Sequence, residues 1–126
     1  MQLGRLGFLM LLLLGWMWLS PGPALAQTTT APNVLPQILE FDRKLCPVCQ
    51  ASERTILAVK DQYPGQFEVK KFYIDEADSV FRRYKVAIVP TQVFLNAAGQ
   101  EVGRHEGVYK QEDLIKKLRE LQFIRE

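Results

Sequence analysis

The chain has 126 residues, 16 of them basic and 14 acidic, so its formal net charge is only +2. Such an even balance gives no electrostatic footprint for nucleic acid or for an anionic membrane surface. With two cysteines and one histidine, the chain also lacks the four Cys or His ligands of a usual structural zinc site. We therefore expect no nucleic-acid partner, no metal and no other cofactor.

The first 26 residues have the pattern of a secretory signal. Arg5 precedes an apolar run from Leu6 to Leu19, and Ala24-Leu25-Ala26 is typical of a cleavage site. The apolar run, about 14 residues, is shorter than the roughly 20 that a membrane span needs, so a retained anchor is the second choice. We therefore expect an exported protein that is periplasmic or otherwise extracytoplasmic.

The remaining chain of about 100 residues is long enough for a single hydrophobic core. Residues 27–33 are polar, uncharged and without periodicity, which indicates a flexible leader. We expect residues 34–126 to form one domain.

The residue patterns of this domain predict alternating strands and helices. Gln37 to Phe41 is strand-like, and Pro47 suits the first turn of a helix that Pro64-Gly65 stops near Tyr63. The later predicted elements are a strand over 67–74, a short helix from Asp78 or Ser79 to Tyr84, hairpin strands over 92–96 and 101–105, and an amphipathic helix over 111–123. The order β-α-β-α-β-β-α predicts an α/β fold with a four-stranded mixed sheet flanked by helices, its first two strands parallel and its last two antiparallel.

Cys46 and Cys49 lie three residues apart, where the first strand gives way to the first helix. Two sulfurs at this spacing can meet across one helical turn, so a disulfide can open and close with little backbone movement. The pattern leaves open a structural bridge or half of a metal site. However, so short a loop constrains the unfolded chain little, and His105 alone cannot complete a zinc site. We interpret the pair as a redox centre.

Further features accompany the cysteines, and with them the chain resembles the thioredoxin family. They are Glu40 six residues before Cys46, Lys71 in the next strand, Val89-Pro90-Thr91 before the hairpin, and Gly107 after it. The resemblance covers residues 34–123 and implies a minimal thioredoxin-like fold without the usual first strand and helix, because only the leader precedes Gln37. We expect the Gln37–Phe41 strand to lack its usual outer neighbour, a gap that a partner or a second copy of the chain could fill.

The resemblance also implies distinct roles for the two cysteines. Cys46 would lie at the N-cap of the helix, where free N–H groups and the helix dipole favour its thiolate and make it the attacking sulfur. Cys49, one turn further, would be more buried and would resolve the mixed disulfide. Pro47 and Val48 between them are expected to contact substrate. Val48 stands where glutaredoxins and periplasmic oxidases carry Tyr or His, and it offers the thiolate no polar group.

Glu40 lies within an apolar strand, where an acidic residue usually faces solvent. The resemblance instead implies a buried carboxylate below the cysteines, with a pKa raised by desolvation, that accepts the proton of Cys49. Lys71 would face Glu40 across adjacent strands and partly offset that shift. We expect Asp42, with the two basic residues that follow it, to form a solvated rim, and His105 to lie on the surface.

Pro90 resembles the family's cis-proline, although an ordinary trans bond is far commoner for proline in general. A cis bond here would expose the backbone of Val89 beside the sulfurs, so that an extended substrate could pair with it as an added strand. Val89, Pro90 and Thr91 are thus predicted substrate-binding residues.

The predicted function is that of an exported thiol–disulfide oxidoreductase. We expect it to reduce cysteines of extracytoplasmic proteins with electrons from a membrane thiol transporter, possible partners being apocytochromes c. Two alternatives stay open: an oxidase that introduces disulfides, and a non-catalytic thioredoxin-fold adaptor that binds peptides. A homo-oligomer is a further expected form, through the incomplete sheet.

Overall fold

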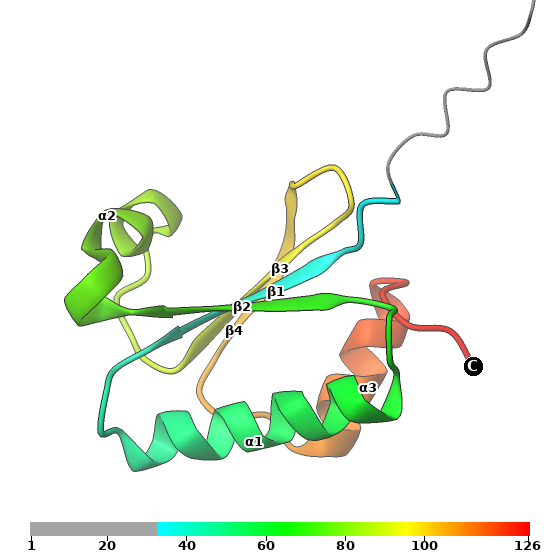
Figure 1. Cartoon of the computed structure of the whole chain (residues 1–126), viewed down its shortest axis with the longest axis horizontal. Coiled ribbons are helices and arrows are strands. Elements are labelled where there is room, and N and C mark those ends of the chain that lie inside the picture. Colours follow the sequence, from blue (N-terminus) through cyan, green and yellow to red (C-terminus); the bar gives the residue numbers. More distant parts are fainter. Residues whose placement is uncertain (1–32) are drawn as a thin grey trace, which may run out of the picture. The chain divides into compact units, whose positions relative to one another are not determined.

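The computed structural model describes residues 33–126 (Figure 1). The predicted signal and the leader up to residue 32 lie outside the described residues. Within the described part, the elements follow the predicted order: β1 (Gln37–Asp42), α1 (Pro47–Gln62), β2 (Glu68–Tyr73), α2 (Ile74–Tyr84), β3 (Thr91–Leu95), β4 (Glu101–Glu106) and α3 (Gln111–Glu120). No helix in residues 33–126 is both long and apolar enough to cross a membrane.

The four strands form one mixed sheet in the order β2-β1-β3-β4. β1 is parallel to β2 and antiparallel to β3, and β3 is antiparallel to β4, which confirms the predicted α/β fold. The prediction that the first strand lacks a neighbour is wrong, because β1 is paired on both sides. Its residues from Ile38 to Asp42 are all buried, which suits an inner strand. Among residues 33–126 the sheet edges are β2 and β4, whose residues are exposed or half-buried.

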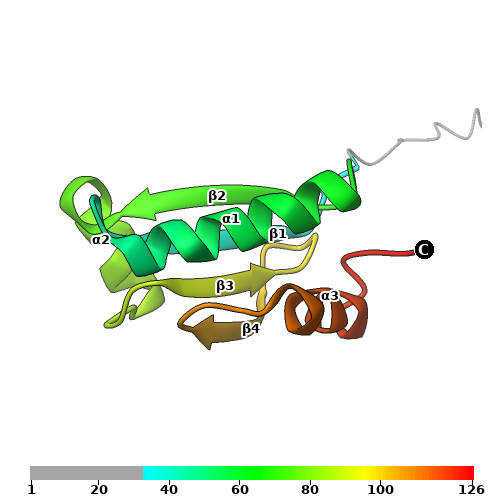
Figure 2. The ribbon, with the colours of Figure 1, turned by 90° about the horizontal axis from the view of Figure 1, so that it is seen from below.

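The helices cover both faces of this sheet. α1 and α3 lie on one face and α2 lies on the other (Figures 1 and 2). Because side chains alternate along a strand, Ile38 and Glu40 point toward α1, whereas Leu39 and Phe41 point toward α2. Two separate sets of side chains are therefore buried, one on each face.

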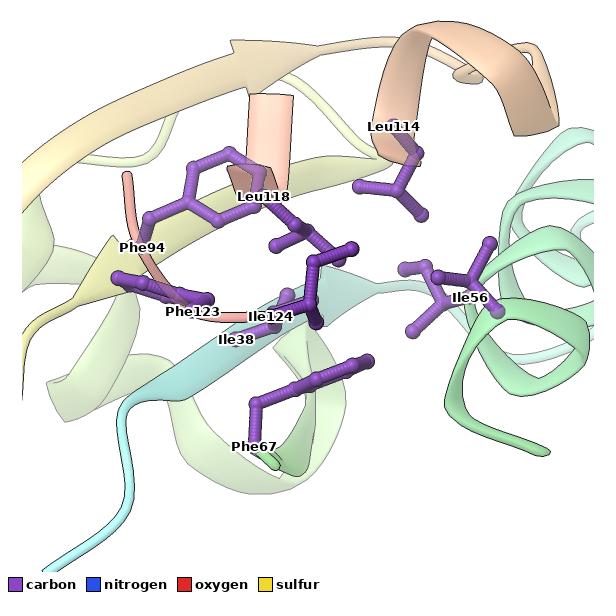
Figure 3. Close-up of a cluster of buried hydrophobic side chains, with 9 residues drawn as sticks. Ile38, Ile56, Phe67, Phe94, Leu114, Leu118, Phe123 and Ile124 are labelled. Atoms are coloured by element: carbon purple, nitrogen blue, oxygen red, sulfur yellow. The ribbon is translucent and has the colours of Figure 1, made fainter. Parts of the chain in front are cut away.

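The larger hydrophobic cluster fills the space between the sheet, α1 and α3 (Figure 3). Its buried members are Ile38, Ile56, Val59, Phe67, Phe94, Leu114, Leu118, Phe123 and Ile124. The smaller cluster, under α2, is centred on Phe41, whose ring lies 4.9 Å from that of Phe81 in an edge-to-face arrangement. The two clusters fix both layers of helices on the sheet.

One helix agrees with the prediction after a kink, and another ends earlier than predicted. α2 begins at Ile74, with Asp75 and Glu76 in a first turn where the helix dipole favours acidic residues. Ala77 has a non-helical backbone (φ −131°, ψ 34°), and the part of α2 that follows this kink, from Asp78 to Tyr84, matches the predicted short helix. α3 ends at Glu120 because Gln122 takes a left-handed conformation (φ 60°) and Phe123 N–H donates to Leu118 O at 2.8 Å. This turn brings Phe123 and Ile124 back into the larger cluster.

Candidate active site

Cys46 is the N-cap of α1, as predicted, and Pro47 occupies the first helical position. Cys46 Sγ accepts a hydrogen bond from the backbone N–H of Cys49 at 3.2 Å. The two cysteines form a disulfide with their Cα atoms 5.2 Å apart. Cys46 is half-buried, whereas Cys49 is only 2% exposed. An incoming sulfur therefore has access to Cys46, and a negative charge on Cys46 would be stabilised by the free N–H groups of the first turn.

Apolar side chains border the accessible cysteine. Leu45 has a positive φ of 57°, which is uncommon for a residue other than glycine, and its side chain is 94% exposed. Val48 is 54% exposed, and Pro47 between the cysteines is exposed too. These residues give the disulfide a hydrophobic border in contact with solvent.

Glu40 lies on the sheet face that α1 covers and is 1% exposed, as predicted. It pairs in register with Lys71 on β2 and with Gln92 on β3. Desolvation, and then the nearby carboxylate of Asp42, raise the pKa of Glu40 to about 7. The Ser52 hydroxyl and the Lys71 ammonium oppose this shift. Glu40 can therefore hold or release a proton near neutral pH.

Asp42 does not belong to a solvated rim, so that prediction is wrong. It is 1% exposed, because β1 continues to this residue and its side chain points to the same face as Glu40. Burial raises its pKa to about 6, against the opposing charge of Lys71. Arg43 and Lys44, which follow it, are exposed as predicted.

Lys71 stands among three carboxylates. Its Nζ lies 3.9 Å from Glu40 Oε2, 3.5 Å from Asp42 Oδ2 and 2.5 Å from Glu53 Oε1 on α1. Burial alone would lower the pKa of Lys71, but Glu53, Glu40 and Asp42 together raise it, so the ammonium is charged. One positive charge thus neutralises only part of the cluster formed by these four residues, which we call the acidic cluster.

The acidic cluster meets a surface cleft of about 430 Å³ beside the disulfide. Its lining residues are Asp42, Arg43, Lys44, Leu45, Cys49, Gln50, Glu53, Lys71 and Tyr73. Cys49 is the only cysteine of the pair that lines this cleft. The cleft therefore gives solvent a path toward the buried sulfur and the carboxylates next to it.

Buried polar side chains continue beneath α1 on the other side of Glu40. The Gln92 amide is fully buried and donates to Ser52 Oγ at 2.8 Å and to Gly107 O at 3.2 Å. The sequence interpretation missed Ser52, Glu53 and Gln92. Ser52 and Glu53 follow Cys49 by three and four residues, the spacing of one helix face, and this spacing could have identified them.

The loop before β3 contains the predicted cis bond, between Val89 and Pro90. The N–H of Gly107 donates to Pro90 O at 2.8 Å, and Gly107 has a φ of +96°, which favours glycine. Thr91 is buried, and its hydroxyl donates to Ile88 O at 2.6 Å. Thr91 thus shapes the loop from within and does not face solvent.

This loop lies at the same end of the sheet as the cysteines. Thr91, the first residue of β3, pairs in register with Phe41 near the end of β1. Pro90, which precedes Thr91, therefore lies beside the end of β1 that leads to Cys46. Figures 1 and 2 both show the start of β3 at the same end of the molecule as the start of α1.

His105, predicted on the surface, is half-buried and stacks on Tyr109 with ring centroids 3.7 Å apart.

No group of three or more His, Cys, Asp or Glu side chains within residues 33–126 is arranged to hold a metal ion. The described site brings together two sulfurs and buried carboxyl groups that can exchange protons.

The comparison with protein families identifies the chain. The sequence profile of the thioredoxin-like domain family matches residues 24–122, more than half of the 126 residues, so the chain belongs to this family. Its Cys46–Cys49 disulfide and its fold agree with this membership.

Individual relatives are thioredoxins. Thioredoxin-1 of Drosophila melanogaster is 33% identical over 58 residues, a match that spans 46% of this chain and 54% of that protein. The chain therefore matches only about half the length of this curated relative. Among solved structures, oxidised thioredoxin O2 of Arabidopsis thaliana is similar with a TM-score of 0.60 and 26% identity, over 70% of this chain and 76% of the other.

A thioredoxin-2 described as a component of the malaria parasite's protein secretion machinery has a TM-score of 0.64 at 21% identity, over 68% of this chain and 82% of the other. At that identity the likeness concerns the fold. Together, the family membership and the close cysteine pair support thiol–disulfide oxidoreductase activity.

Proposed function

We propose that the protein is an exported thiol–disulfide oxidoreductase that reduces disulfides of extracytoplasmic proteins. The observation that carries the proposal is the unequal placement of its two cysteines. Cys46 is accessible at the N-cap of α1, and Cys49 is buried beside a cleft and the acidic cluster. This asymmetry suits one sulfur that attacks and one that resolves.

The reaction follows from this asymmetry. In the reduced protein the Cys46 thiolate attacks a substrate disulfide, forms a mixed disulfide and releases one substrate thiol. Cys49 then loses its proton, and its sulfur attacks Cys46, which releases the second substrate thiol and restores the Cys46–Cys49 disulfide. Glu40, with a pKa of about 7, is our proposed acceptor of the Cys49 proton, and Lys71 stabilises the carboxylate form of Glu40.

Substrate would bind along the loop before β3. No hydrogen bond within residues 33–126 uses the backbone N–H or C=O of Val89, so both groups can pair with an extended peptide. Leu45 and Val48 are exposed apolar side chains near Cys46, and Ile88 in the loop is 51% exposed. A peptide with apolar residues around its cysteine would suit this surface.

Two considerations support reduction over oxidation. Val48 places no polar or cationic group between the cysteines, whereas periplasmic oxidases carry His there. The surroundings of the pair otherwise resemble those of thioredoxin. In an oxidising compartment a dithiol needs a supply of electrons, so we propose a membrane thiol transporter as the electron donor.

Equilibration of the protein with a series of glutathione ratios tests this proposal. We expect a reversible dithiol–disulfide equilibrium with a potential in the range of reductases, near or below about −230 mV. A potential near −120 mV would instead indicate an oxidase. A Cys46–Cys49 disulfide that resists a small dithiol in the folded protein would indicate a non-catalytic adaptor and contradict the enzyme proposal.

A further inference from the structure

Asp42 is a second buried carboxyl group below the cysteines, and the reaction described above gives it no role. It lies two residues after Glu40 on the same face of β1 and is equally buried, at 1% exposed. Its Oδ2 faces Lys71 Nζ at 3.5 Å, whereas its Oδ1 has no hydrogen-bond partner among residues 33–126. An ionised carboxylate with an unpartnered buried oxygen is costly, so this group has a reason to bind a proton.

The position of Asp42 differs from that of Glu40 in one respect. Asp42 lines the cleft together with Cys49, whereas Glu40 is not among the lining residues. Exposure then increases along the acidic cluster, from 1% at Asp42 to 18% at Lys71 and 38% at Glu53. Asp42 therefore lies between the buried carboxyl of Glu40 and the part of the cluster that reaches solvent.

Charged and other ionisable side chains face Asp42 from every element packed against it. Glu40 faces it from β1, Lys71 and Tyr73 from β2, Glu53 and Cys49 from α1, and Arg43 and Lys44 lie in the loop that follows. Within the cluster, one ammonium faces three carboxyl groups, two of them deeply buried. Because burial raises the pKa of both Glu40 and Asp42, the pair retains a proton into the neutral pH range.

We propose that Asp42 is the group through which the proton of Cys49 leaves the site toward the cleft. This inference rests on the proposed oxidoreductase function and adds a proton route to it. When Cys49 resolves the mixed disulfide, its thiol proton passes to the Glu40–Asp42 pair as its sulfur bonds to Cys46. The bond between Cys46 and the substrate sulfur breaks, and that sulfur leaves as a thiolate. The substrate disulfide is thus reduced by two electrons, and Asp42 passes the proton to water in the cleft beside Glu53.

Asp42 in this account relays a proton between Glu40 and the cleft water and does not act on the substrate itself. Single-turnover oxidation of the reduced protein by a disulfide-containing peptide, followed from pH 5.5 to 9.5, tests its role. We expect Asp42→Asn to slow the resolving step by about tenfold near pH 6.5 and to approach the wild-type rate above pH 9, where water removes the proton without help. The first step, measured in a Cys49→Ser background with and without Asp42→Asn, should change by less than about twofold.

Asp61→Asn is the matched control, because Asp61 is an exposed carboxylate near the far end of α1. It should leave both steps unchanged. If the wild-type protein exchanges disulfides but Asp42→Asn reacts like wild type at every pH, or is slower by the same factor at every pH, the proton route is wrong and the oxidoreductase proposal stands. If wild-type protein does not exchange at all, the proposed function itself fails.

A measurement on the unaltered protein covers the case in which Asp42→Asn does not fold. In protein labelled with ¹³C at side-chain carboxyl groups, the Asp42 signal should show a transition well above the usual Asp range, with a second inflection where Glu40 titrates. It should also move between the oxidised and reduced forms. A single transition near pH 4 that is identical in both forms would overturn the proposal.

Discussion

The face of the sheet under α1 has two unlike halves. At one end, Ile38 and Phe94 are paired in register and belong to the larger hydrophobic cluster. Two residues further along β1, the next paired row contains Lys71, Glu40 and Gln92, all polar and beneath the same helix. The apolar half stabilises the fold. The polar half lowers its stability, because burying carboxyl groups costs free energy, but it places groups that titrate near neutral pH beside a sulfur. Substitutions in the two halves should therefore affect different properties.

Removal of the sulfurs should have the largest effect on activity. Cys46→Ser should abolish disulfide exchange, because it removes the accessible sulfur, and it should trap no substrate. Cys49→Ser should also stop turnover but should accumulate mixed disulfides through Cys46. Non-reducing gels and mass spectrometry after incubation with a disulfide-containing peptide distinguish the two. Mixed disulfides through Cys49 in the Cys46→Ser variant would reverse the assigned order.

Phe94→Ala tests the apolar half. Its ring is fully buried and lies against the rings of Tyr109 and Phe123, so truncation should lower the free energy of unfolding by about 3–5 kcal/mol. Denaturant titration of the oxidised protein measures this. The shape of the pH–rate profile of the folded variant should match that of wild type. A pH–rate profile shifted along the pH axis would mean that the apolar half also affects the groups that titrate in the polar half.

Glu40→Gln tests the polar half through stability. The folded-state pKa of Glu40, about 7, exceeds the ordinary value of 4.5, so the folded protein holds this proton more tightly than the unfolded chain. The contribution of Glu40 to stability is therefore fully present below about pH 4.5 and is lost as the pH rises through about 7. We expect Glu40→Gln to raise the free energy of unfolding by about 1–3 kcal/mol at pH 8 and to change it little at pH 4. Equal effects at both pH values would show that Glu40 does not titrate as described.

Gly107→Ala should have the smallest effect of the four. An added Cβ would meet nothing within 4 Å, so the expected cost of about 1–2 kcal/mol comes from the φ of +96° alone. If the backbone relaxes from this φ, it displaces the N–H that donates to Pro90 O, so peptide affinity should also decrease. Gly103→Ala in the same strand region has an ordinary φ and is the control, with a change below about 0.5 kcal/mol in stability. Equal losses of unfolding free energy in both variants would show that the positive φ of Gly107 has no special role.

The sequence predicted the fold because its periodic segments and its turn residues agree with one another. Pro47 and Pro64 mark the limits of α1, and the hydrophobic runs gave the strands to within a residue or two. The inner position of β1 was not predicted, since pairing on both sides depends on contacts with distant strands. In the site, the cysteines, Glu40 and the cis bond at Pro90 were predicted because family motifs carry them.

The polar neighbours of these motifs were missed for a physical reason. Asp42 is followed by two exposed basic residues, so its local pattern is that of a solvated loop. In the fold, Lys71 of another strand lies against Asp42, and Glu53 of α1 pairs with that lysine. Gln92 similarly acquires its partners from α1 and from the residue after β4. Such groupings arise only when the elements pack together.

Limited alkylation of the reduced protein tests the central claim, the asymmetry of the two cysteines, most directly. At mildly acidic pH, with less than one equivalent of reagent, mass mapping should find the label on Cys46 alone, because this sulfur is accessible and faces the N-terminus of α1. Equal labelling of Cys46 and Cys49, or labelling of Cys49 first, would contradict the account.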